Sequence, residues 1–386
     1  MKPRLLHFLA CPLDGGPLDL MIWEANDTAL SAADLERARA AGIDPAELER
    51  EIMTGVLVNP RRRTFYPIHA GVPRLLTFST GVCAEFVRTH GARLAAELPG
   101  FSPPHERAMP GEEDVLRTFS AEWLNYDWDG KAYWNLEPEA WLRCMRFMLD
   151  LERRPIRNQR VLEVGIGIGG VADAHASREG AEVVGMDLGY ATDAAFKNFG
   201  RNPFLHIVQA SVFAPPLKPA QFDLVYSFGV IHHTFSTKQA FDRLAWLPRR
   251  GGRLYVWVYS PFDEERTLKR RILMKMENVI RPIAWRLPER AQAVVLAPLV
   301  PLYIAHQRWQ AFRSGAGQIT YGWREAMHAA RDRFTPRYVH RHTDEEVLGW
   351  FKDAGYGALE VASQRERPDW VPIAFTASAG IDGVRS

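Results

Sequence analysis

The sequence predicts an α/β protein built on a doubly wound, mostly parallel sheet of seven strands. Two observations carry this prediction. Between residues 156 and 260, short apolar strands alternate with helical segments, and the first strand runs into the glycine-rich turn of VLEVGIGIGG (161–170). The same alternation returns over residues 335–386, after a helical interruption at 261–334. We therefore expect one α/β core that carries a helical insert and is completed by the C-terminal helix and strands.

Residues 1–78 predict a small β-rich domain in front of this core. GVLVNPRRRTFYPIHAGVPRLL (55–76) is typical of two short strands around a turn, and LERARAAGIDPAELERE (35–51) of a helical stretch interrupted at Gly42 and Pro45. Residues 79–155 are expected to be a helical linker rich in aromatic residues: Trp123, Tyr126, Trp128, Tyr133 and Trp134. Such a segment either packs as a plain helix or forms a lid whose rings attract a cationic ligand.

The core strands are predicted from apolar runs bounded by turn residues. They are expected at Arg160–Val164, Glu182–Asp187, Phe204–Gln209, Phe222–Ser227 and Arg253–Tyr259, with two more near 358–364 and 370–378. Thr343 opens the helix TDEEVLGWFKDAGY as a capping box with Glu346.

Composition excludes several classes of protein. Of 386 residues, 47% are hydrophobic and 24% charged, which is ordinary for a folded globular chain, and the formal charge of +2 gives no reason to expect a nucleic-acid partner. The three cysteines share no short spacing, so neither a metal site nor a disulfide framework is expected among them. No apolar run is long enough for a membrane span or a signal peptide. A cytoplasmic location is expected.

The glycine turn is the first sign of chemistry. A strand that ends in glycines and leads into a helix offers backbone N–H groups to an anionic ligand, and Asp187, at the end of the next strand, can accept both hydroxyls of a ribose. Gly165, Gly167 and Gly170 satisfy the dinucleotide spacing, whereas Glu163 followed by alternating glycines suggests a different nucleoside cofactor. The loop alone leaves both interpretations open.

The elements that follow decide between them. FDLVYSFGVIHHT (222–234) and the LPRRGGR sequence (247–253) at the entry to the fifth strand accompany the glycine turn and Asp187 in order and at suitable spacing. Over residues 155–260 the chain thus resembles the class I S-adenosylmethionine-dependent methyltransferases, in particular the small-molecule group called type 11. The resemblance implies a Rossmann-like sheet, S-adenosyl-L-methionine as the cofactor, and methyl transfer as the activity.

The resemblance also assigns residues to the cofactor. Glu163 would lie beneath the loop near the methionine ammonium group, the loop glycines would admit the methionine portion, and Asp187 would hold the ribose. The complete expected set is Glu163, Gly165, Gly167, Gly169, Asp187, Leu188, Ser211, Val212 and Phe228.

Ser211 is a departure from the family pattern. It stands in VQASVFAPPL where an aspartate that accepts from the adenine amino group is usual. A hydroxyl also accepts a hydrogen bond, but without charge it forms a weaker one. The alternatives are that backbone and apolar side chains hold the adenine well enough, or that cofactor binding is reduced.

His232 and His233 follow the fourth strand, at the carboxyl edge where open α/β sheets bind ligands. As the candidate catalytic residues, they could deprotonate an acceptor hydroxyl. The alternative is that one ring packs against the cofactor and the other caps the turn. Methyl transfer from a sulfonium needs alignment first, and a base only for weakly acidic acceptors.

Two further segments bear on the acceptor. RDRFTPRYVHRHT (331–343) offers Arg333, Tyr338, His340 and His342, which either face the acceptor or are solvated. Residues 261–313 place basic residues beside apolar ones, which suggests either a lid over the acceptor or contact with an anionic membrane surface. A bulky or lipid-like acceptor is therefore expected, while the oligomeric state is left open.

The N-terminal LACPLDGGPLDL and YPIHAGVPRLL resemble a small zinc-ribbon family that partners or precedes methyltransferases. Structural zinc requires four thiolate or imidazole ligands. Only Cys11 remains, and Asp14, Asn59 and Arg62 occupy the other expected ligand places. The resemblance thus implies a degenerate ribbon without metal, kept for packing or interaction. The main functional hypothesis is a methyltransferase, and the alternative is a non-catalytic binding protein that retains its fold.

Overall fold

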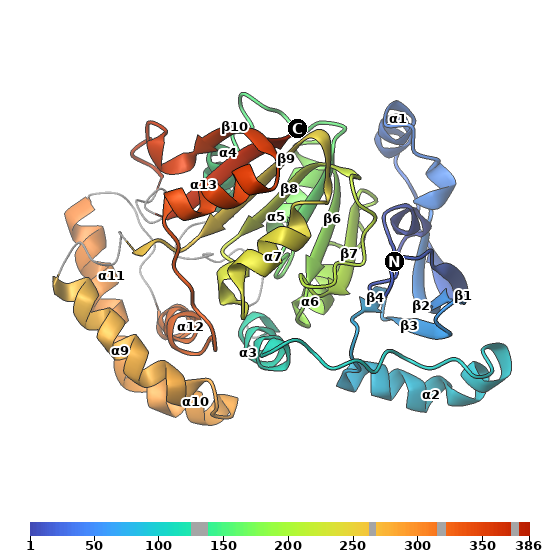
Figure 1. Cartoon of the computed structure of the whole chain (residues 1–386), viewed down its shortest axis with the longest axis horizontal. Helices are drawn as coiled ribbons and strands as arrows, with labels where there is room; N and C mark the ends of the chain where they lie inside the picture. Colours follow the sequence, from blue (N-terminus) through green and yellow to red (C-terminus); the bar gives the residue numbers. More distant parts are fainter. Residues whose placement is uncertain (125–137, 262–267, 315–321, 372–377) are drawn as a thin grey trace.

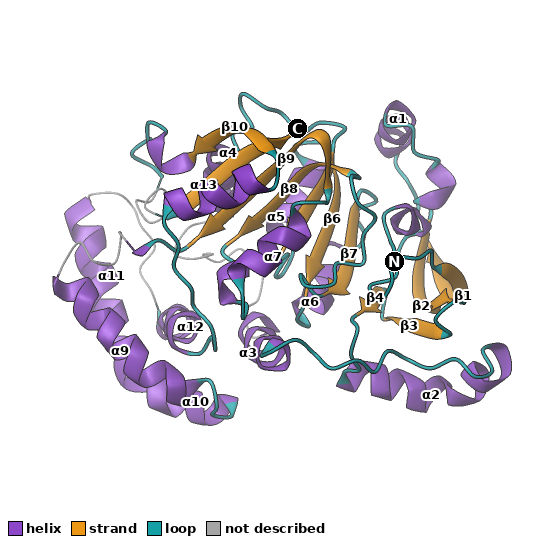
Figure 2. Cartoon of the chain, in the orientation of Figure 1, coloured by secondary structure: helices purple, strands orange, loops and turns teal. Residues whose placement is uncertain are grey.

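The computed structural model describes residues 1–124, 138–261, 268–314, 322–371 and 378–386. Its centre is a single sheet of eleven strands with helices on both faces, in the order β1-β2-β3-β4-β7-β6-β5-β8-β9-β11-β10 (Figures 1 and 2). The central pairs from β4 to β9 are parallel, and the pairs toward either end are antiparallel. The predicted doubly wound α/β fold is therefore confirmed.

The sheet is larger than the seven strands that the sequence predicts, because four N-terminal strands continue it. The core strands are β5 (Arg160–Val164), β6 (Glu182–Asp187), β7 (Leu205–Ala210), β8 (Phe222–Phe228), β9 (Pro248–Val258), β10 (Tyr356–Val361) and β11 (Ala379–Arg385). The first two have the predicted bounds. The last strand, expected near 370–378, begins at Ala379; residues 372–377 lie outside the described part of the chain.

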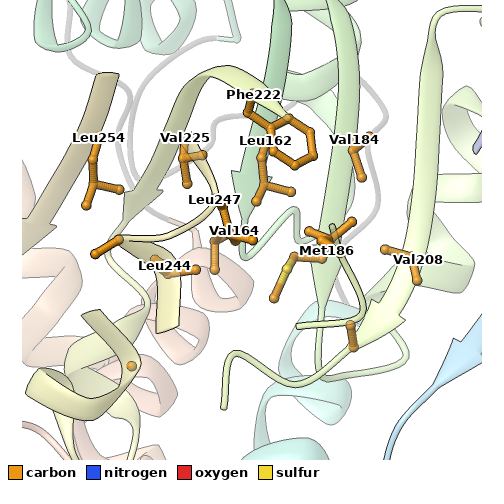
Figure 3. Packing of buried hydrophobic residues seen from close by; sticks show 14 of the residues in the cluster. Leu162, Val164, Val184, Met186, Val208, Phe222, Val225, Leu244, Leu247 and Leu254 are labelled. Carbon is orange, nitrogen blue, oxygen red and sulfur yellow. The ribbon is translucent and has the colours of Figure 1, made fainter. Parts of the chain in front are cut away.

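The two faces of the sheet are covered by different helices. Side chains alternate along each central strand, so that Leu162, Val184 and Val225 pack on the face of α7 (Thr237–Leu244) and α13 (Asp344–Asp353) (Figure 3). Their neighbours pack on the opposite face, which is covered by α4 (Pro138–Met148), α5 (Gly170–Ser177), α6 (Ala191–Phe199) and α1 (Ala32–Ala40). Both faces of the central strands are apolar because helices cover both faces of a parallel sheet.

The N-terminal unit joins this sheet edge to edge. Its strands are β1 (Asp19–Asp27), β2 (Arg50–Asn59), β3 (Thr64–His69) and β4 (Val72–Leu75), so residues 55–76 form parts of three strands rather than two. β4 pairs in parallel with β7 through Arg74–Gln209 and Leu75–Ala210. The short helices η1 (Pro3–His7) and η2 (Pro45–Glu47) complete the unit.

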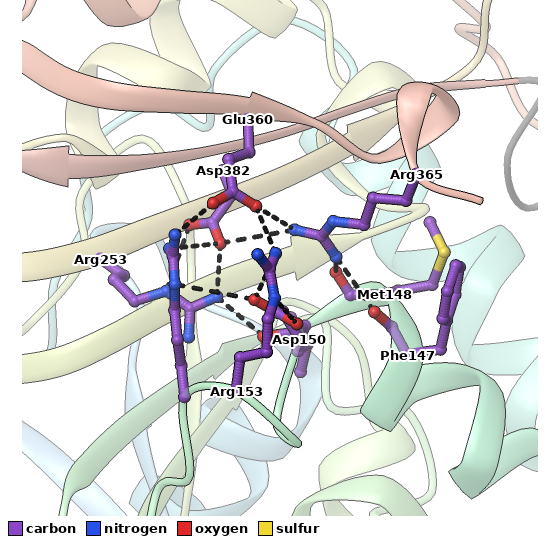
Figure 4. A network of polar contacts seen from close by, with 10 residues as sticks. Phe147, Met148, Asp150, Arg153, Arg253, Glu360, Arg365 and Asp382 are labelled. Carbon is purple, nitrogen blue, oxygen red and sulfur yellow. Dashed lines mark hydrogen bonds and ion pairs between the residues drawn. The ribbon is translucent and has the colours of Figure 1, made fainter. Parts of the chain in front are cut away.

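A polar network fixes the opposite end of the sheet (Figure 4). Asp382 on β11 is buried and accepts from Arg253 on β9, whose guanidinium also donates to Leu149 O at 2.7 Å. Arg365 donates to the carbonyls of Phe147 and Met148 at 3.0 and 2.9 Å. Burial raises the pKa of Asp382, and its arginine partners oppose that shift. The network ties the segment after α4 to the two antiparallel strands.

The remaining helices form a layer beside the sheet. α2 (Gly81–Glu97) and α3 (Glu112–Leu124) lead into the core, and the insert consists of α9 (Leu268–Ala284), α10 (Glu289–Leu296), η4 (Ala297–Leu299), α11 (Val300–Ser314) and α12 (Trp323–Phe334). α3 and α12 lie side by side below the central strands (Figure 1). No helix in the described ranges combines the length and apolarity that crossing a membrane would need.

Candidate active site

The glycine loop turns sharply between β5 and α5. Gly165, Gly167 and Gly169 have φ of 86°, 52° and 90°, in the left-handed region that favours glycine. A Cβ on Gly165 would lie 2.2 Å from Val230 Cγ2, whereas one on Gly167 would reach only van der Waals distance from Trp123. Packing against Val230 therefore requires a glycine at position 165. Gly167 leaves space beside the Trp123 ring.

Four amides of the loop donate hydrogen bonds within the protein, whereas no such acceptor is found among the described residues for the amides of Gly170 and Val171 at the start of α5. Gly165 and Ile166 donate to Met186 O at 2.8 and 3.1 Å, and Gly169 donates to Ile166 O. The Gly167 amide donates to Asp187 Oδ2 at 3.1 Å. These bonds fix the loop against β6, and the amides of Gly170 and Val171 in the first turn of α5 remain as donors toward a ligand.

Asp187, at the end of β6, is held by backbone donors on both oxygens. Gly167 donates to Oδ2, and Gly189 donates to Oδ1 at 2.9 Å. Burial raises its pKa, although these amides oppose the shift. A carboxylate oxygen accepts more than one hydrogen bond, so each retains capacity for a ligand hydroxyl. The geometry fits a vicinal diol such as a ribose.

Glu163 lies on β5, two residues before Gly165, and its carboxyl group is buried. Burial raises its pKa to about 8, Tyr226 opposes the shift by donating a hydrogen bond, and the charge of Asp187 adds to it. Its Oε2 has no hydrogen-bond partner among the described residues. A buried carboxyl with an unpartnered oxygen fits a cationic ligand group such as an ammonium. The Tyr226 hydroxyl lies 3.2 Å from His175 Nδ1, which extends this buried polar chain.

α3 crosses the same edge of the sheet. Glu112, at its first turn, accepts from the Ser211 hydroxyl at the end of β7 and from Met109 N at 2.7 Å. Eight residues later, Ser120 Oγ accepts from Tyr190 N at 2.9 Å, after β6. Trp123 then lies over Gly167. The helix thus follows the ends of β7, β6 and β5 in turn.

The other expected cofactor residues line this edge. Leu188 and Val212 are half-buried. Phe228, half-buried at the end of β8, stacks on Trp257 with ring centroids 4.5 Å apart and packs edge-on against Trp141. Ser211 is buried and also accepts from Phe213 N at 3.1 Å. Of the expected lid aromatics, only Trp123 lies in the described ranges; Tyr126, Trp128, Tyr133 and Trp134 lie outside them.

The two histidines sit in different environments. His232 is fully buried 4.1 Å from the Tyr259 ring, and neither of its ring nitrogens has a partner among the described residues. His233 Nδ1 donates to Tyr338 O at 3.0 Å, which leaves Nε2 as the acceptor in the neutral ring. Burial lowers the pKa of His233 to about 4 and holds that of His232 well below its ordinary value. Both rings are therefore neutral, weak bases.

The segment 331–343 uses most of its polar groups within the protein. His340 Nε2 donates to Thr234 O at 3.0 Å, His342 Nδ1 bonds Glu346 Oε1 at 2.9 Å, and Arg333 pairs with Glu277. Thr343 caps α13 by accepting from Glu346 N at 3.2 Å, while the Glu346 carboxylate serves His342 rather than completing a capping box. Tyr338 stacks on His340.

The former ligand positions of the N-terminal ribbon come together as a hydrogen-bonded cluster. Asn59 Nδ2 donates to Asp14 Oδ1 at 2.9 Å, and Arg62 N donates to Asn59 Oδ1 at 3.1 Å. Cys11 Sγ lies 3.2 Å from the Tyr66 hydroxyl. Within the described ranges, no group of three or more His, Cys, Asp or Glu residues could hold a metal ion. The hydrogen bonds of Asn59 thus join the loop at Asp14 to the turn at Arg62.

Sequence reasoning missed Glu112, Ser120 and the Tyr226–His175 contact. Glu112 is separated from Ser211 by 99 positions, and nothing local marks it apart from its place in an acidic first turn. The only available signal was the missing charge at Ser211, which could have prompted a search for a carboxylate from elsewhere.

Two family models match parts of the chain. A family model described as a methyltransferase domain matches residues 162–256, and one described as a Trm112p-like protein matches residues 2–71. Among solved structures, the phosphoethanolamine N-methyltransferase 2 of Haemonchus contortus, with phosphomonomethylethanolamine and S-adenosylhomocysteine, is similar at 15% identity and a TM-score of 0.43. That match covers 73% of this chain and 62% of the Haemonchus chain.

Two other solved structures are also similar to this chain. The magnesium protoporphyrin IX methyltransferase of Synechocystis, with bound S-adenosylhomocysteine, has 14% identity, a TM-score of 0.43, and coverage of 71% of this chain and all of that chain. A Haloferax volcanii complex of the Trm112 methyltransferase activator with a putative methyltransferase has 13% identity, a TM-score of 0.36, and coverage of 64% and 97%. Residues 162–256 therefore form a methyltransferase domain of the S-adenosylmethionine-dependent class I type, and residues 2–71 form a Trm112p-like domain.

Proposed function

We propose that the chain transfers the methyl group of S-adenosylmethionine to a small-molecule or lipid-like acceptor bound at the carboxyl edge of the sheet. The observation that carries this proposal is the pair Glu163 and Asp187 on neighbouring parallel strands. One has an unpartnered buried oxygen suited to an ammonium group, and the other has two oxygens suited to a diol. Methionine and ribose are joined in that order in the cofactor.

The protein's part in the reaction is mainly alignment. The bound cofactor supplies a methyl group on a sulfonium, which an acceptor lone pair displaces directly. Glu163 holds the ammonium group, Asp187 holds the ribose, and Trp123 covers the loop. Alignment of this kind can provide much of the rate enhancement of a two-substrate reaction.

We assign different roles to the two histidines. His232 packs beneath the site against Tyr259, and His233 offers Nε2 to orient a hydrogen on the acceptor. A ring whose pKa is about 4 is a poor general base near neutral pH. The acceptor is therefore expected to be nucleophilic without proton removal by His233.

The insert supports a lipid-like acceptor and contact with an anionic membrane surface. Residues 268–314 carry nine lysines and arginines against two acidic residues. Val279, Val294 and Leu302 on its helices are 69%, 74% and 64% exposed. Apolar side chains beside cations are the combination that anionic interfaces attract. Of the expected span 261–313, residues 262–267 lie outside the described ranges.

Calorimetry tests the cofactor assignment. The wild-type chain should bind S-adenosylmethionine and S-adenosylhomocysteine and should not bind NAD. Absence of heat with both sulfur compounds at millimolar concentration would overturn the proposal.

The Asp187→Ala variant should weaken binding of S-adenosylhomocysteine by about 1–3 kcal/mol, because a charge-assisted hydrogen bond to the ribose is lost. Asp242→Ala, near the C-terminal end of α7 and with 47% of its side chain exposed, serves as the control and should bind normally. Equal affinities for wild type and Asp187→Ala would place the ribose elsewhere.

Incubation with labelled S-adenosylmethionine and either a total lipid extract or an aqueous metabolite extract tests the acceptor. Label in the lipid fraction supports the lipid-like acceptor, and label only in the aqueous fraction excludes it. Cofactor binding without transfer to either extract favours the non-catalytic alternative.

A further inference from the structure

The end of β7 lies at the position expected for the adenine base of the bound cofactor. β6 pairs with β7 through Asp187–Gln209, so Ser211 lies one strand beyond Asp187 and two residues past this pair. Adjacent strands are about 4.8 Å apart. With the methionine portion at the β5 loop and the ribose at Asp187, a ligand that continues in the same direction brings its base to Leu188 and Ser211. This inference rests on the cofactor placement proposed above.

Glu112 brings a carboxylate to that point. It is 4% exposed, its Oε1 accepts from the Ser211 hydroxyl, and its Oε2 accepts from Met109 N. Because Ser211 donates its only hydrogen to Glu112, its oxygen can act only as an acceptor toward a ligand. Phe213 N occupies one of its two lone pairs, which leaves one available.

The whole of α3 is arranged along the path of the cofactor. Glu112, Ser120 and Trp123 fall on one face of the helix, since their spacing of eight and three residues turns them by less than a quarter of a circle. They contact Ser211, Tyr190 N and the space over Gly167, respectively. The position of Glu112 at the base end is therefore part of the placement of the helix and not an isolated contact.

We propose that Glu112 and Ser211 together accept the exocyclic amino group of the cofactor's adenine, with Glu112 supplying the negative charge that Ser211 lacks. A hydroxyl that donates to a carboxylate is polarised and becomes a stronger acceptor. Two residues, one on α3 and one on β7, thus share the task of accepting the adenine amino group. A single carboxylate on β7 could perform the same task alone. Burial raises the pKa of Glu112, which is consistent with a carboxylate that gains from a further donor.

The test compares S-adenosylhomocysteine with S-inosylhomocysteine, in which an oxygen replaces the amino group. Calorimetry on the wild type should show clear preference for the adenosine compound. Glu112→Gln should lower affinity for it about tenfold and leave affinity for the inosine compound nearly unchanged, so that the preference falls. Glu112→Gln combined with Ser211→Asp should restore the preference, because the charge returns on β7.

Glu113→Gln is the matched control, since Glu113 lies on the same turn of α3 but is exposed. It should retain the wild-type preference. Equal loss of affinity for both compounds in Glu112→Gln would show that Glu112 serves only to start α3, and unchanged affinity for both would also overturn the inference. Failure of the wild type to bind S-adenosylhomocysteine would instead contradict the cofactor placement itself.

Discussion

The N-terminal unit and the helical insert are both additions to the same core, and they attach to it in opposite ways. Leu5, Phe8 and Leu9 of the N-terminal unit belong to the same apolar cluster as the central strands. The insert has small clusters of its own, one around Leu296 and Phe334 and one around Val300. One addition is continuous with the core, and the other forms a separate layer beside it (Figure 1).

Both additions have a buried ion-paired carboxylate, since Glu277 of the insert is 1% exposed and pairs with Arg341, but they differ in the side chains that they leave exposed. Arg4 of the N-terminal unit and Glu182 at the start of β6 are each 6% exposed and are joined by two hydrogen bonds of 2.7 and 3.2 Å. The insert instead leaves large apolar side chains in solvent, such as Val294 and Leu302. The N-terminal unit is therefore a permanent part of the core, whereas the exposed apolar side chains of the insert form a surface available for contact.

The largest effect is expected at the N-terminal junction. Arg4→Ala should destabilise the whole chain by about 3–5 kcal/mol, because the Glu182 carboxylate would remain buried without its arginine partner. Urea unfolding measures this change. Arg290→Ala, at an exposed position of the insert, is the control and should change stability by less than about 0.5 kcal/mol. Similar values for the two variants would remove the distinction between the junctions.

The same junction should make stability depend on pH. Burial alone would raise the pKa of Glu182, but hydrogen bonds from His206 and Arg4 lower it to about 2. A carboxyl whose folded pKa is depressed stabilises the fold above its unfolded pKa near 4.5, and this contribution is lost as the pH falls toward 2. It amounts to roughly 3 kcal/mol.

Unfolding midpoints of wild type and Glu182→Gln, measured between pH 5 and pH 3, test this dependence. The variant should lose less stability over that range, because the titrating group is absent. Parallel curves for the two proteins would contradict the assignment of this pH dependence to Glu182.

The smallest effect on stability is expected on the exposed face of the insert. Val294→Ser combined with Leu302→Ser should change the free energy of unfolding by less than about 0.5 kcal/mol. The same variant should bind vesicles of anionic phospholipid about tenfold more weakly, because apolar burial at the interface is lost. Sedimentation with the vesicles measures this binding.

Leu296→Ala is the matched control. Leu296 lies on α10, like Val294, but it is fully buried. It should cost about 2–5 kcal/mol in stability. If the doubly substituted variant binds the vesicles as strongly as the wild type does, the insert is not the membrane-contacting surface.

The sequence predicted what depends on local pattern. β5 and β6 have their predicted bounds because apolar alternation and the following turn residues define both ends, and Glu163 and Asp187 lie where strand periodicity places them. Contacts between distant segments were not predictable. The Glu112–Ser211 bond depends on how α3 lies across the sheet, and β4 joins β7 over more than 130 positions. The internal use of the loop amides likewise depends on the register between β5 and β6.

Because β4 pairs with β7, the edge strand on this side of the sheet is β1 and not β7. All six residues of β7 are buried, and an unpaired strand of this kind would offer its free backbone groups to other chains. The N-terminal unit moves the edge to β1, a largely exposed strand with Asp19, Glu24 and Asp27 and with irregular register around Glu24. Acidic, irregular edges resist further pairing. The fused unit should therefore protect the catalytic core against aggregation, independently of any role in catalysis.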